Sequence, residues 1–473
     1  MENSSEQPGH TTTTRRRYRS FVTANTPAPQ SAQGYTRDIL RLAIPAYVTL
    51  VAEPLFLLAD SAIIGHLGTS SLAGVGIAGA ILSTAAGLFV FLAYSTTAVV
   101  ARTLGAAGTR HALGAGLDGI WLAAALGILS CAVVGLGAAP LAAAFGPSPE
   151  VLSHAITYLR ISALGLPAML LTLATTGILR GLQDTRTPLL VTTFGFTANI
   201  ALNVWFVLGL HLGVAGSAWG TVIAQNSMAL ALLAVVARAA HHHRAPRRPH
   251  LRGILTAAVD GVPLLVRTLA LRTILLLTTW AAAALGDIPL AAYQVSATIW
   301  TFLTFSLDAL AIAGQSLTGH ALGRGDTAAA RTMTTMMTRW GTWCGVALGV
   351  LLLPLHTVLP VLFTPDQGVR DALAMALLVV ALGQPISGYV FVLDGVLIGA
   401  GDARWLALAQ VWLLVAYAPL AVAVHVCADQ LTSTGPGIAV MVLWGAFQIF
   451  MGLRAVALGR RARTDSWMTV GAA

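Results

Sequence analysis

Charged residues are scarce in this chain of 473 residues, and lysine does not occur at all. Hydrophobic residues make up 56% of the sequence and charged residues 10%, and the mean hydropathy is +0.77. A soluble protein of this length needs more polar surface than such a composition supplies. The composition therefore excludes a soluble protein and predicts an integral membrane protein.

Cysteine is equally scarce, with only Cys131, Cys344 and Cys427. Each lies in an apolar stretch, with no histidine or second cysteine at the spacing that metal ligands need. We therefore expect no disulfide framework, no metal site and no cofactor.

The net charge of +9 comes entirely from arginine. A basic surplus can indicate nucleic-acid binding, but most of these arginines gather in short loops between apolar runs, on the side that both termini share. This distribution follows the positive-inside rule. We predict a multi-pass protein of the cell membrane with both termini in the cytoplasm and no nucleic-acid partner.

Apolar runs of about 20 residues or more predict transmembrane helices. Twelve such runs occur, at residues 39-65, 73-100, 115-140, 150-178, 186-208, 213-238, 254-284, 289-320, 333-360, 368-396, 404-427 and 435-458. We expect an all-α membrane protein that is built from these twelve spans.

An internal repeat relates the two halves at one constant offset, the offset that takes position 45 to position 263. The matched pairs include residues that are uncommon in apolar helices, namely Pro45 with Pro263, Gly105 with Gly323, Gly177 with Gly395, and Asp184 with Asp402. Six spans per half is an even number, so both halves enter the membrane with the same polarity. The repeat predicts two six-helix lobes about an axis along the membrane normal, an architecture that is typical of secondary transporters.

The domain organisation follows from these spans. Residues 1-36 are rich in Ser, Thr, Gln and Pro and lack the features of a cleavable signal peptide, so we expect a disordered cytoplasmic arm. The other predicted parts are an N-lobe over 37-238, an Arg- and His-rich cytoplasmic linker over 239-253, a C-lobe over 254-458 and a cytoplasmic tail over 459-473.

Four segments carry a family resemblance: EPLFLLADSAIIGHLG at 53-68, GLQDTRTP at 181-188, NIALN at 199-203 and GVLIGAGD at 395-402. With the two six-span lobes, they resemble the multidrug and toxic compound extrusion (MATE) family and its DinF-like branch, over about residues 38 to 460. The resemblance implies the MATE fold and a cation-coupled antiporter that exports amphipathic small molecules or drugs by alternating access. We expect a monomer that is surrounded by membrane lipids, because one chain supplies both lobes.

The resemblance also implies a proton-binding layer in the N-lobe. Asp60, Asn199, Asn203 and Thr221 match the family's pocket, and their positions along the spans place Asp60, Asn203 and Thr221 roughly 8 to 12 Å below the outer surface. Many relatives have Asp where this chain has Asn203, which leaves Asp60 as the one titratable carboxylate of the layer. We expect H⁺ as the coupling ion, with Na⁺ as the alternative. The polar residues could instead simply join helix to helix by hydrogen bonds.

Two prolines in the first span, Pro45 and Pro54, free backbone groups and allow that helix to bend. We expect it to be the moving element. The other charges within the spans are assigned structural roles because unpaired charges in a membrane are costly. They are an ion pair of Glu53 with Arg160, and at least one pair of Arg267 or Arg272 with Asp308 or Asp394.

Two alternative functions are a flippase for lipid-linked sugars and a membrane enzyme. A flippase for lipid-linked sugars shares the two-lobe plan, but such flippases often have more spans and a strongly cationic cavity. A polyprenyl-transferring membrane enzyme needs clustered carboxylates to hold Mg²⁺. No two acids within the predicted spans are closer in sequence than Glu53 and Asp60, so we predict that the protein is not an enzyme.

Overall fold

The computed structural model describes residues 32-65, 69-246 and 250-472. The side chains of residues 32, 33, 53, 55-62, 65 and 69 lie outside the described part as well. The chain forms two compact units, residues 1-38 and residues 39-473. The two lobes described below both lie within residues 39-473. The predicted N-terminal arm lies almost wholly outside the described residues.

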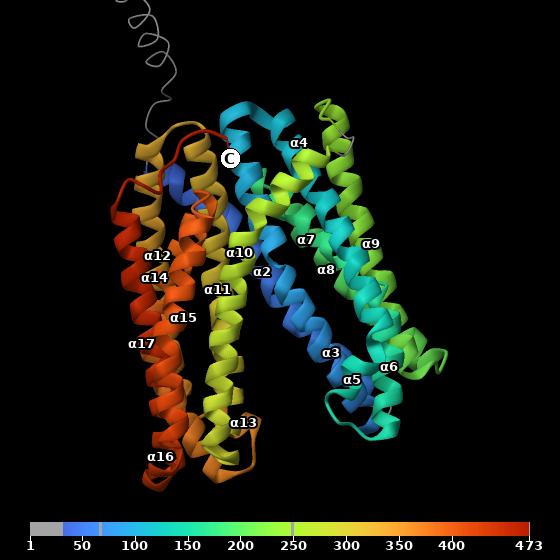
Figure 1. Ribbon diagram of the computed structural model, residues 1–473, viewed down its shortest axis with the longest axis vertical. Helices are drawn as coiled ribbons and strands as arrows, with labels where there is room; N and C mark the ends of the chain where they lie inside the picture. The colour runs from blue at the N-terminus through green and yellow to red at the C-terminus, as the bar shows by residue number, and fades with distance from the viewer. Residues whose placement is uncertain (1–31, 66–68, 247–249, 473) are drawn as a thin grey trace, which may run out of the picture. The chain divides into compact units, whose positions relative to one another are not determined.

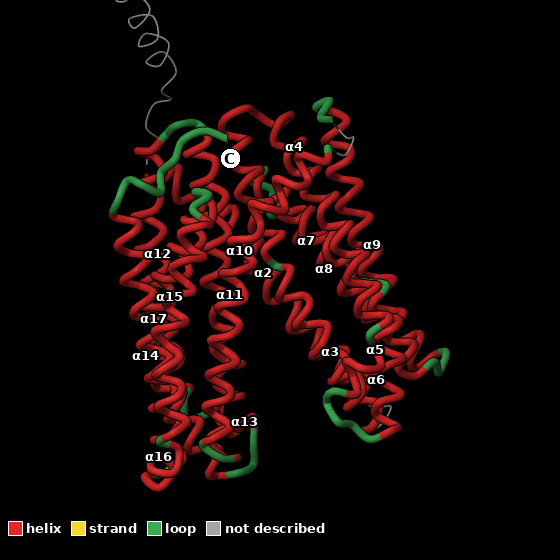
Figure 2. Tube along the Cα trace, viewed as in Figure 1, coloured by secondary structure: helices red, strands yellow, loops and turns green. Residues whose placement is uncertain are grey.

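Helices and short loops make up the whole described part of the chain (Figure 2). A helix satisfies all of its own backbone hydrogen bonds, which is what an apolar surrounding demands of a spanning segment. The first half forms α2 (Ala32–Gly65), α3 (Thr69–Phe89), α4 (Phe91–Leu136), α5 (Ala138–Ala143), α6 (Pro149–Ala163), α7 (Leu166–Gly181), α8 (Arg186–Asn203), a π-helical turn at Val204–Gly209 and α9 (Gly213–His242). The second half forms α10 (Leu251–Ala284), α11 (Asp287–Gly323), α12 (Thr327–Leu355), α13 (Leu359–Phe363), α14 (Gln367–Gly399), α15 (Ala403–Val426), α16 (Ala428–Thr434) and α17 (Pro436–Arg463).

These helices lie where the sequence predicts the spans. Among the described residues, nine helices are long and apolar enough to cross a membrane, or ten if α6 and α7, bent by 48°, count as one span. One of the nine, Ser70–Leu136, covers two predicted spans, because α4 continues through the loop expected between them. The chain changes direction there at Gly108, whose φ of 78° suits glycine. The count leaves out α2, part of which has undescribed side chains.

The helices pack as two lobes, each from one half of the sequence. In the N-lobe, α4 packs against α7, α3 against α6, and α9 against both α7 and α8. In the C-lobe, α14 is central and packs against α11, α12 and α17, while α10 packs against α15. Figure 1 shows α11 to α17, in yellow to red, standing together. The expected grouping of helices is therefore present.

Repeat-related glycines make the same contact in the two lobes. A Cβ on Gly177 of α7 would lie 2.8 Å from the carbonyl oxygen of Ala93 on α4, and a Cβ on Gly395 of α14 would collide with the carbonyl oxygen of Ala311 on α11. The repeat pairs Ala93 with Ala311, just as it pairs the two glycines. These glycines let the helix backbones touch, which explains why the sequence repeat preserves them.

The two lobes meet at another repeat-related pair, Gly105 on α4 and Gly323 on α11. A Cβ on Gly105 would collide with the carbonyl oxygen of His320, and a Cβ on Gly323 would collide with that of Arg102. Arg102 and His320 themselves occupy corresponding positions in the repeat. The contact is the same from either side, so the axis of the repeat passes between α4 and α11, as the parallel repeat predicts.

The C-terminal segment after α17 packs against both lobes. Trp467 is buried, and the amide of Gly471 donates to the carbonyl oxygen of Leu322 at 3.1 Å. Arg102 of α4 is also buried, and it donates to the carbonyl oxygens of Thr469 and Gly471 at 3.1 and 3.2 Å. The tail predicted from residue 459 therefore begins as helix, up to Arg463, and then joins the two lobes.

The predicted linker differs from expectation, and the two repeated loop acids differ from each other. Much of the linker over 239-253 is helical, because α9 runs to His242 and α10 begins at Leu251. The repeated loop acids differ from each other: Asp184 accepts hydrogen bonds from the amides of Arg186 and Thr187 at 3.0 Å and so caps α8. Asp402 instead receives two hydrogen bonds from Arg461, at 2.7 and 3.1 Å.

Candidate functional site

The N-lobe contains a buried polar layer between α8 and α9. Asn203 donates from Nδ2 to Oδ1 of Asn199 at 2.9 Å, and both side chains are buried, with 0% and 2% exposed. A Cβ on Gly220 would collide with Oδ1 of Asn203, so the amide of Asn203 reaches α9 beside Thr221. The hydroxyl of Thr221 is buried, and no described residue forms a hydrogen bond with it. The structure thus joins Asn199 to Asn203 and places Asn203 against α9, next to the position of Thr221.

Asp60 and Glu53 lie on α2, and their side chains are outside the described residues. Their predicted roles, in the proton layer and in a pair with Arg160, therefore stay predictions. Arg160 is exposed in the last turn of α6 and forms no ion pair with a described residue.

Pro45 and Pro54 both lie inside α2. Proline has no amide hydrogen, so Pro45 leaves the carbonyl oxygen of Arg41 without its helical donor. The hydroxyl of Thr185, in the turn before α8, lies 3.5 Å from that oxygen. The helix therefore continues through Pro45 but lacks one backbone hydrogen bond where the sequence predicts a bend, and a neighbouring loop supplies a donor.

Directly after Asn203, the chain forms a π-helical turn over Val204–Gly209. Such turns are rare and occur frequently at functional sites. The sequence does not predict this feature, because the apolar run over 186-208 is compatible with a regular helix. The turn places an irregular segment of backbone immediately beside the polar layer.

The C-lobe contains a cluster of buried charges around Asp394 of α14. Arg267 of α10 donates to both carboxylate oxygens of Asp394, and Arg454 of α17 forms an ion pair with Oδ1 at 3.1 Å. The expected pairing of Arg267 with an acid is therefore present. The sequence does not single out Arg454 as a buried charge, because it lies near the end of the last predicted span and resembles the loop arginines.

Asp308 of α11 lies in the same electrostatic environment. Its carboxylate interacts with the charges of Asp394, Arg267 and Arg454, and with Arg180 of α7. Arg180 belongs to the N-lobe, so the charges of the C-lobe extend to the other lobe. Arg267 therefore supplies the one pair that was expected, whereas Arg272 is exposed and pairs with no described carboxylate.

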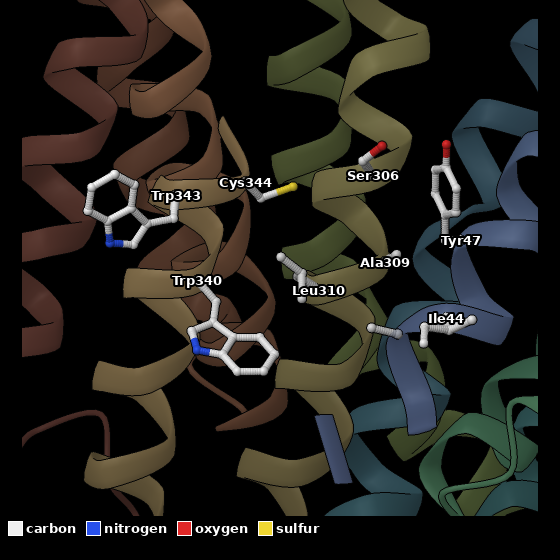
Figure 3. Close-up of a pocket in the computed structure, with 9 residues that line it drawn as sticks. Ile44, Tyr47, Ser306, Ala309, Leu310, Trp340, Trp343 and Cys344 are labelled. Carbon is white, nitrogen blue, oxygen red and sulfur yellow. The ribbon is translucent and has the colours of Figure 1, made fainter. Parts of the chain in front are cut away.

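An apolar cavity of about 540 Å³ opens between α2, α11 and α12. Aromatic and aliphatic side chains form most of its wall, as Figure 3 shows for Ile44, Tyr47, Leu310, Trp340 and Trp343. Such a wall suits the apolar part of a small molecule, and its few polar groups include the hydroxyls of Tyr47 and Ser306 and the thiol of Cys344.

Sequence comparison decides the family. The MatE family model matches residues 45–205 and again 263–423, two segments whose first positions are the repeat-related Pro45 and Pro263. The chain belongs to the MatE family. Proteins of the MatE family are transporters, so this chain is a transporter and not an enzyme, as predicted.

Similar proteins occur in plants and bacteria. The chain is 30% identical to Protein DETOXIFICATION 43 of Arabidopsis thaliana, over 89% of each protein. It is 29% identical to DNA damage-inducible protein F of Escherichia coli, over 91% of this chain and 94% of that one. These relatives agree with the expected DinF-like branch.

Solved structures agree with the fold. The Vibrio cholerae MATE transporter VcmN superposes with a TM-score of 0.82 at 20% identity, over 92% of this chain and 99% of that one. A MOP superfamily transporter from Pyrococcus furiosus gives a TM-score of 0.79 at 20% identity, over 91% and 95%. The MATE fold predicted from the sequence is confirmed.

Proposed function

We propose that this MatE-family protein exports amphipathic small molecules across the cell membrane in exchange for protons. In this proposal the two lobes rock about the axis between α4 and α11, and they open alternately to the cytoplasm, which holds both termini, and to the outside. Lobe contacts through Gly105, Gly323 and Arg102 support it, because they close one side of the lobe interface.

The observation that carries the proposal is the buried layer of Asn199, Asn203 and Thr221. Two buried amides, together with a hydroxyl that has no partner among the described residues, form a polar surface in an apolar lobe. Burying such groups is costly unless they have a use or a partner. In the proposal, Asp60 of α2 completes this layer and carries the proton.

The coupling step is a change in the charge of Asp60. Ionised Asp60 favours the shape of α2 in which its carboxylate meets the amides of the layer. Protonation removes the charge and favours a bent α2, with Pro45 and Pro54 as the places that bend. A ligand shifts such an equilibrium only if it binds the two shapes with different affinity, so substrate must prefer the ionised shape.

Transport by Asp60→Asn tests this step. The variant and the wild type are reconstituted in proteoliposomes, and efflux of a fluorescent amphipathic dye is followed under an imposed pH gradient. We expect the variant to bind the dye but to lose efflux driven by the gradient. Undiminished efflux would refute the mechanism and direct attention to Glu53, Asp308 and Asp394.

A gain-of-function variant tests the choice of ion. Asn203→Asp adds a second carboxylate to the layer, and carboxylate oxygens are good ligands for hard cations. We expect Asn203→Asp to make efflux dependent on Na⁺, while the wild type depends on the proton gradient. Equal Na⁺ dependence of both proteins would contradict this assignment.

A further inference from the structure

Arg272 is an exposed arginine in the middle of a long apolar helix. It lies twelve residues before the end of α10 at Ala284, which corresponds to roughly 18 Å along the helix axis. Among the described residues, ion pairs are formed by Arg267, Arg331, Arg454 and Arg461, and Arg272 forms none. A cation at that depth is costly, so an arginine held there without a partner indicates a function.

The guanidinium of Arg272 lies between the two lobes. It packs against Gly87 of α3, where an added Cβ would collide with Nη2 and lie 2.8 Å from Cζ. Gly87 is buried, and α3 belongs to the N-lobe whereas α10 belongs to the C-lobe. A larger residue at position 87 would displace the guanidinium, so the glycine gives Arg272 its place.

The two acids that could pair with an arginine of α10, Asp394 and Asp308, already interact with other arginines. Asp394 forms ion pairs with both Arg267 and Arg454. Asp308 interacts electrostatically with the same two arginines and with Arg180. The two carboxylates therefore leave none for Arg272. Arg272 forms no ion pair with a described carboxylate, and its positive charge favours an anion over a cation.

We propose that Arg272 is the anion subsite of the transporter, and that it binds the carboxylate, sulfonate or phosphate group of an amphipathic substrate. The planar guanidinium suits such groups because it can donate two parallel hydrogen bonds to them. The apolar part of the substrate then lies against the surrounding helices. This inference rests on the proposed export of amphipathic molecules and narrows them to anions.

A lipid headgroup carries the same chemistry, but its position argues against it. The hydrocarbon core of a bilayer is about 30 Å thick, and an arginine roughly 18 Å from the end of its helix lies close to the middle. Headgroups lie at the two surfaces, so the proposal commits to a soluble amphipathic anion.

Binding of three matched probes to the purified protein in neutral detergent tests the proposal. The probes are naphthylacetate, its neutral amide and the cation naphthylethylammonium, which share one apolar ring. We expect the wild type to bind the carboxylate about tenfold more tightly than the amide, and the cation most weakly. Equal affinities, or a preference for the cation, would overturn the proposal.

Four variants separate the charge of Arg272 from its place in the fold. Arg272→Gln should remove the preference for the carboxylate, and Arg272→Lys should retain part of it. Gly87→Ala keeps the charge but displaces it, so it should weaken carboxylate binding and leave amide binding unchanged. Arg339→Gln, an exposed arginine on α12, is the matched control and should keep the preference. A preference that survives in Arg272→Gln would overturn the proposal.

Nanodiscs distinguish a soluble anion from a lipid. Replacing half of the phosphatidylcholine by phosphatidylglycerol should leave the affinity for naphthylacetate unchanged. Competition by the anionic lipid would assign Arg272 to lipid and refute the proposal. None of these binding assays needs an ion gradient, so their results do not depend on proton coupling. If the protein transports the dye but shows no preference for the carboxylate probe, the anion subsite is refuted and the proposed export is not.

Discussion

Arg102 donates from Nη1 to the carbonyl oxygen of Ala400 at 2.8 Å, across 298 residues of sequence. Nη2 of the same guanidinium reaches the carbonyl oxygens of Thr469 and Gly471. One buried side chain of the N-lobe thereby joins the turn after α14 and the C-terminal tail. Each hydrogen bond from a charged donor contributes about 1.5 to 3 kcal/mol to the stability of the folded protein. Arg102 is therefore a principal contact between the lobes.

Arg102→Ala should therefore release the tail. We expect faster hydrogen exchange over residues 464-472 and a lower melting temperature in detergent, because the tail loses its donors on α4. Arg331→Ala is the control, since its pair with Asp465 is exposed and should contribute less than about 1 kcal/mol. Equal exchange in Arg102→Ala and in the wild type would mean that other contacts, such as Trp467 and the hydrogen bond of Gly471 to Leu322, hold the tail without Arg102.

Asp394→Asn should destabilise the C-lobe strongly. The change leaves the guanidiniums of Arg267 and Arg454 buried without their carboxylate, and breaking a buried pair in this way costs about 3 to 5 kcal/mol. Thermal unfolding in detergent measures the loss. Asp371→Asn, at an exposed position of the same helix, should lie close to the wild type, and the same result for Asp394→Asn would refute the structural role of the cluster.

Asn199→Ala should destabilise the N-lobe moderately. It removes the acceptor for Nδ2 of Asn203, and the loss of a buried hydrogen bond costs about 1 to 3 kcal/mol. Thr197→Ala on an exposed face of α8 is the matched change. If both variants melted at the same temperature, the amide pair would not stabilise the lobe.

Gly323→Ala should weaken the contact between the lobes. The new methyl group would collide with the backbone carbonyl of Arg102, which cannot move as a side chain can. A single Cys reporter near this contact should then react faster with a thiol reagent than in the parent protein. Gly445→Ala on α17 has open space around its Cβ and should stabilise its helix by up to about 1 kcal/mol. Unchanged reactivity in Gly323→Ala would show that α4 and α11 can separate slightly at no cost.

Much of the fold could be predicted because apolar length and repetition are local properties of the sequence. The offset that pairs Gly177 with Gly395 is the same one that relates their contacts in space. Residues 199 and 203 are one helical turn apart, so their meeting on one face of α8 followed from spacing alone. Arg267 could be paired with an acid because a buried charge demands one.

Features that depend on where distant helices meet could not be predicted. Arg102 and Arg454 resemble the other arginines near span ends, and only the packing of α4, α14 and α17 buries them. The π-helical turn after Asn203 has an ordinary apolar sequence. The exposed position of Arg272 depends on the absence of a side chain at Gly87, a residue of the other lobe.

The contact of Gly105 and Gly323 is self-complementary. Gly105 meets the carbonyl oxygen of His320, Gly323 meets that of Arg102, and the repeat pairs Arg102 with His320 just as it pairs the glycines. A contact of this kind is isologous, like the interface of a two-fold dimer. A chain of half this length could make it with a second copy of itself, using one glycine twice. The joined chain needs two separate substitutions to alter both sides, so the halves are free to diverge: the N-lobe has the amide pair of Asn199 and Asn203, and the C-lobe has the ion pairs of Asp394.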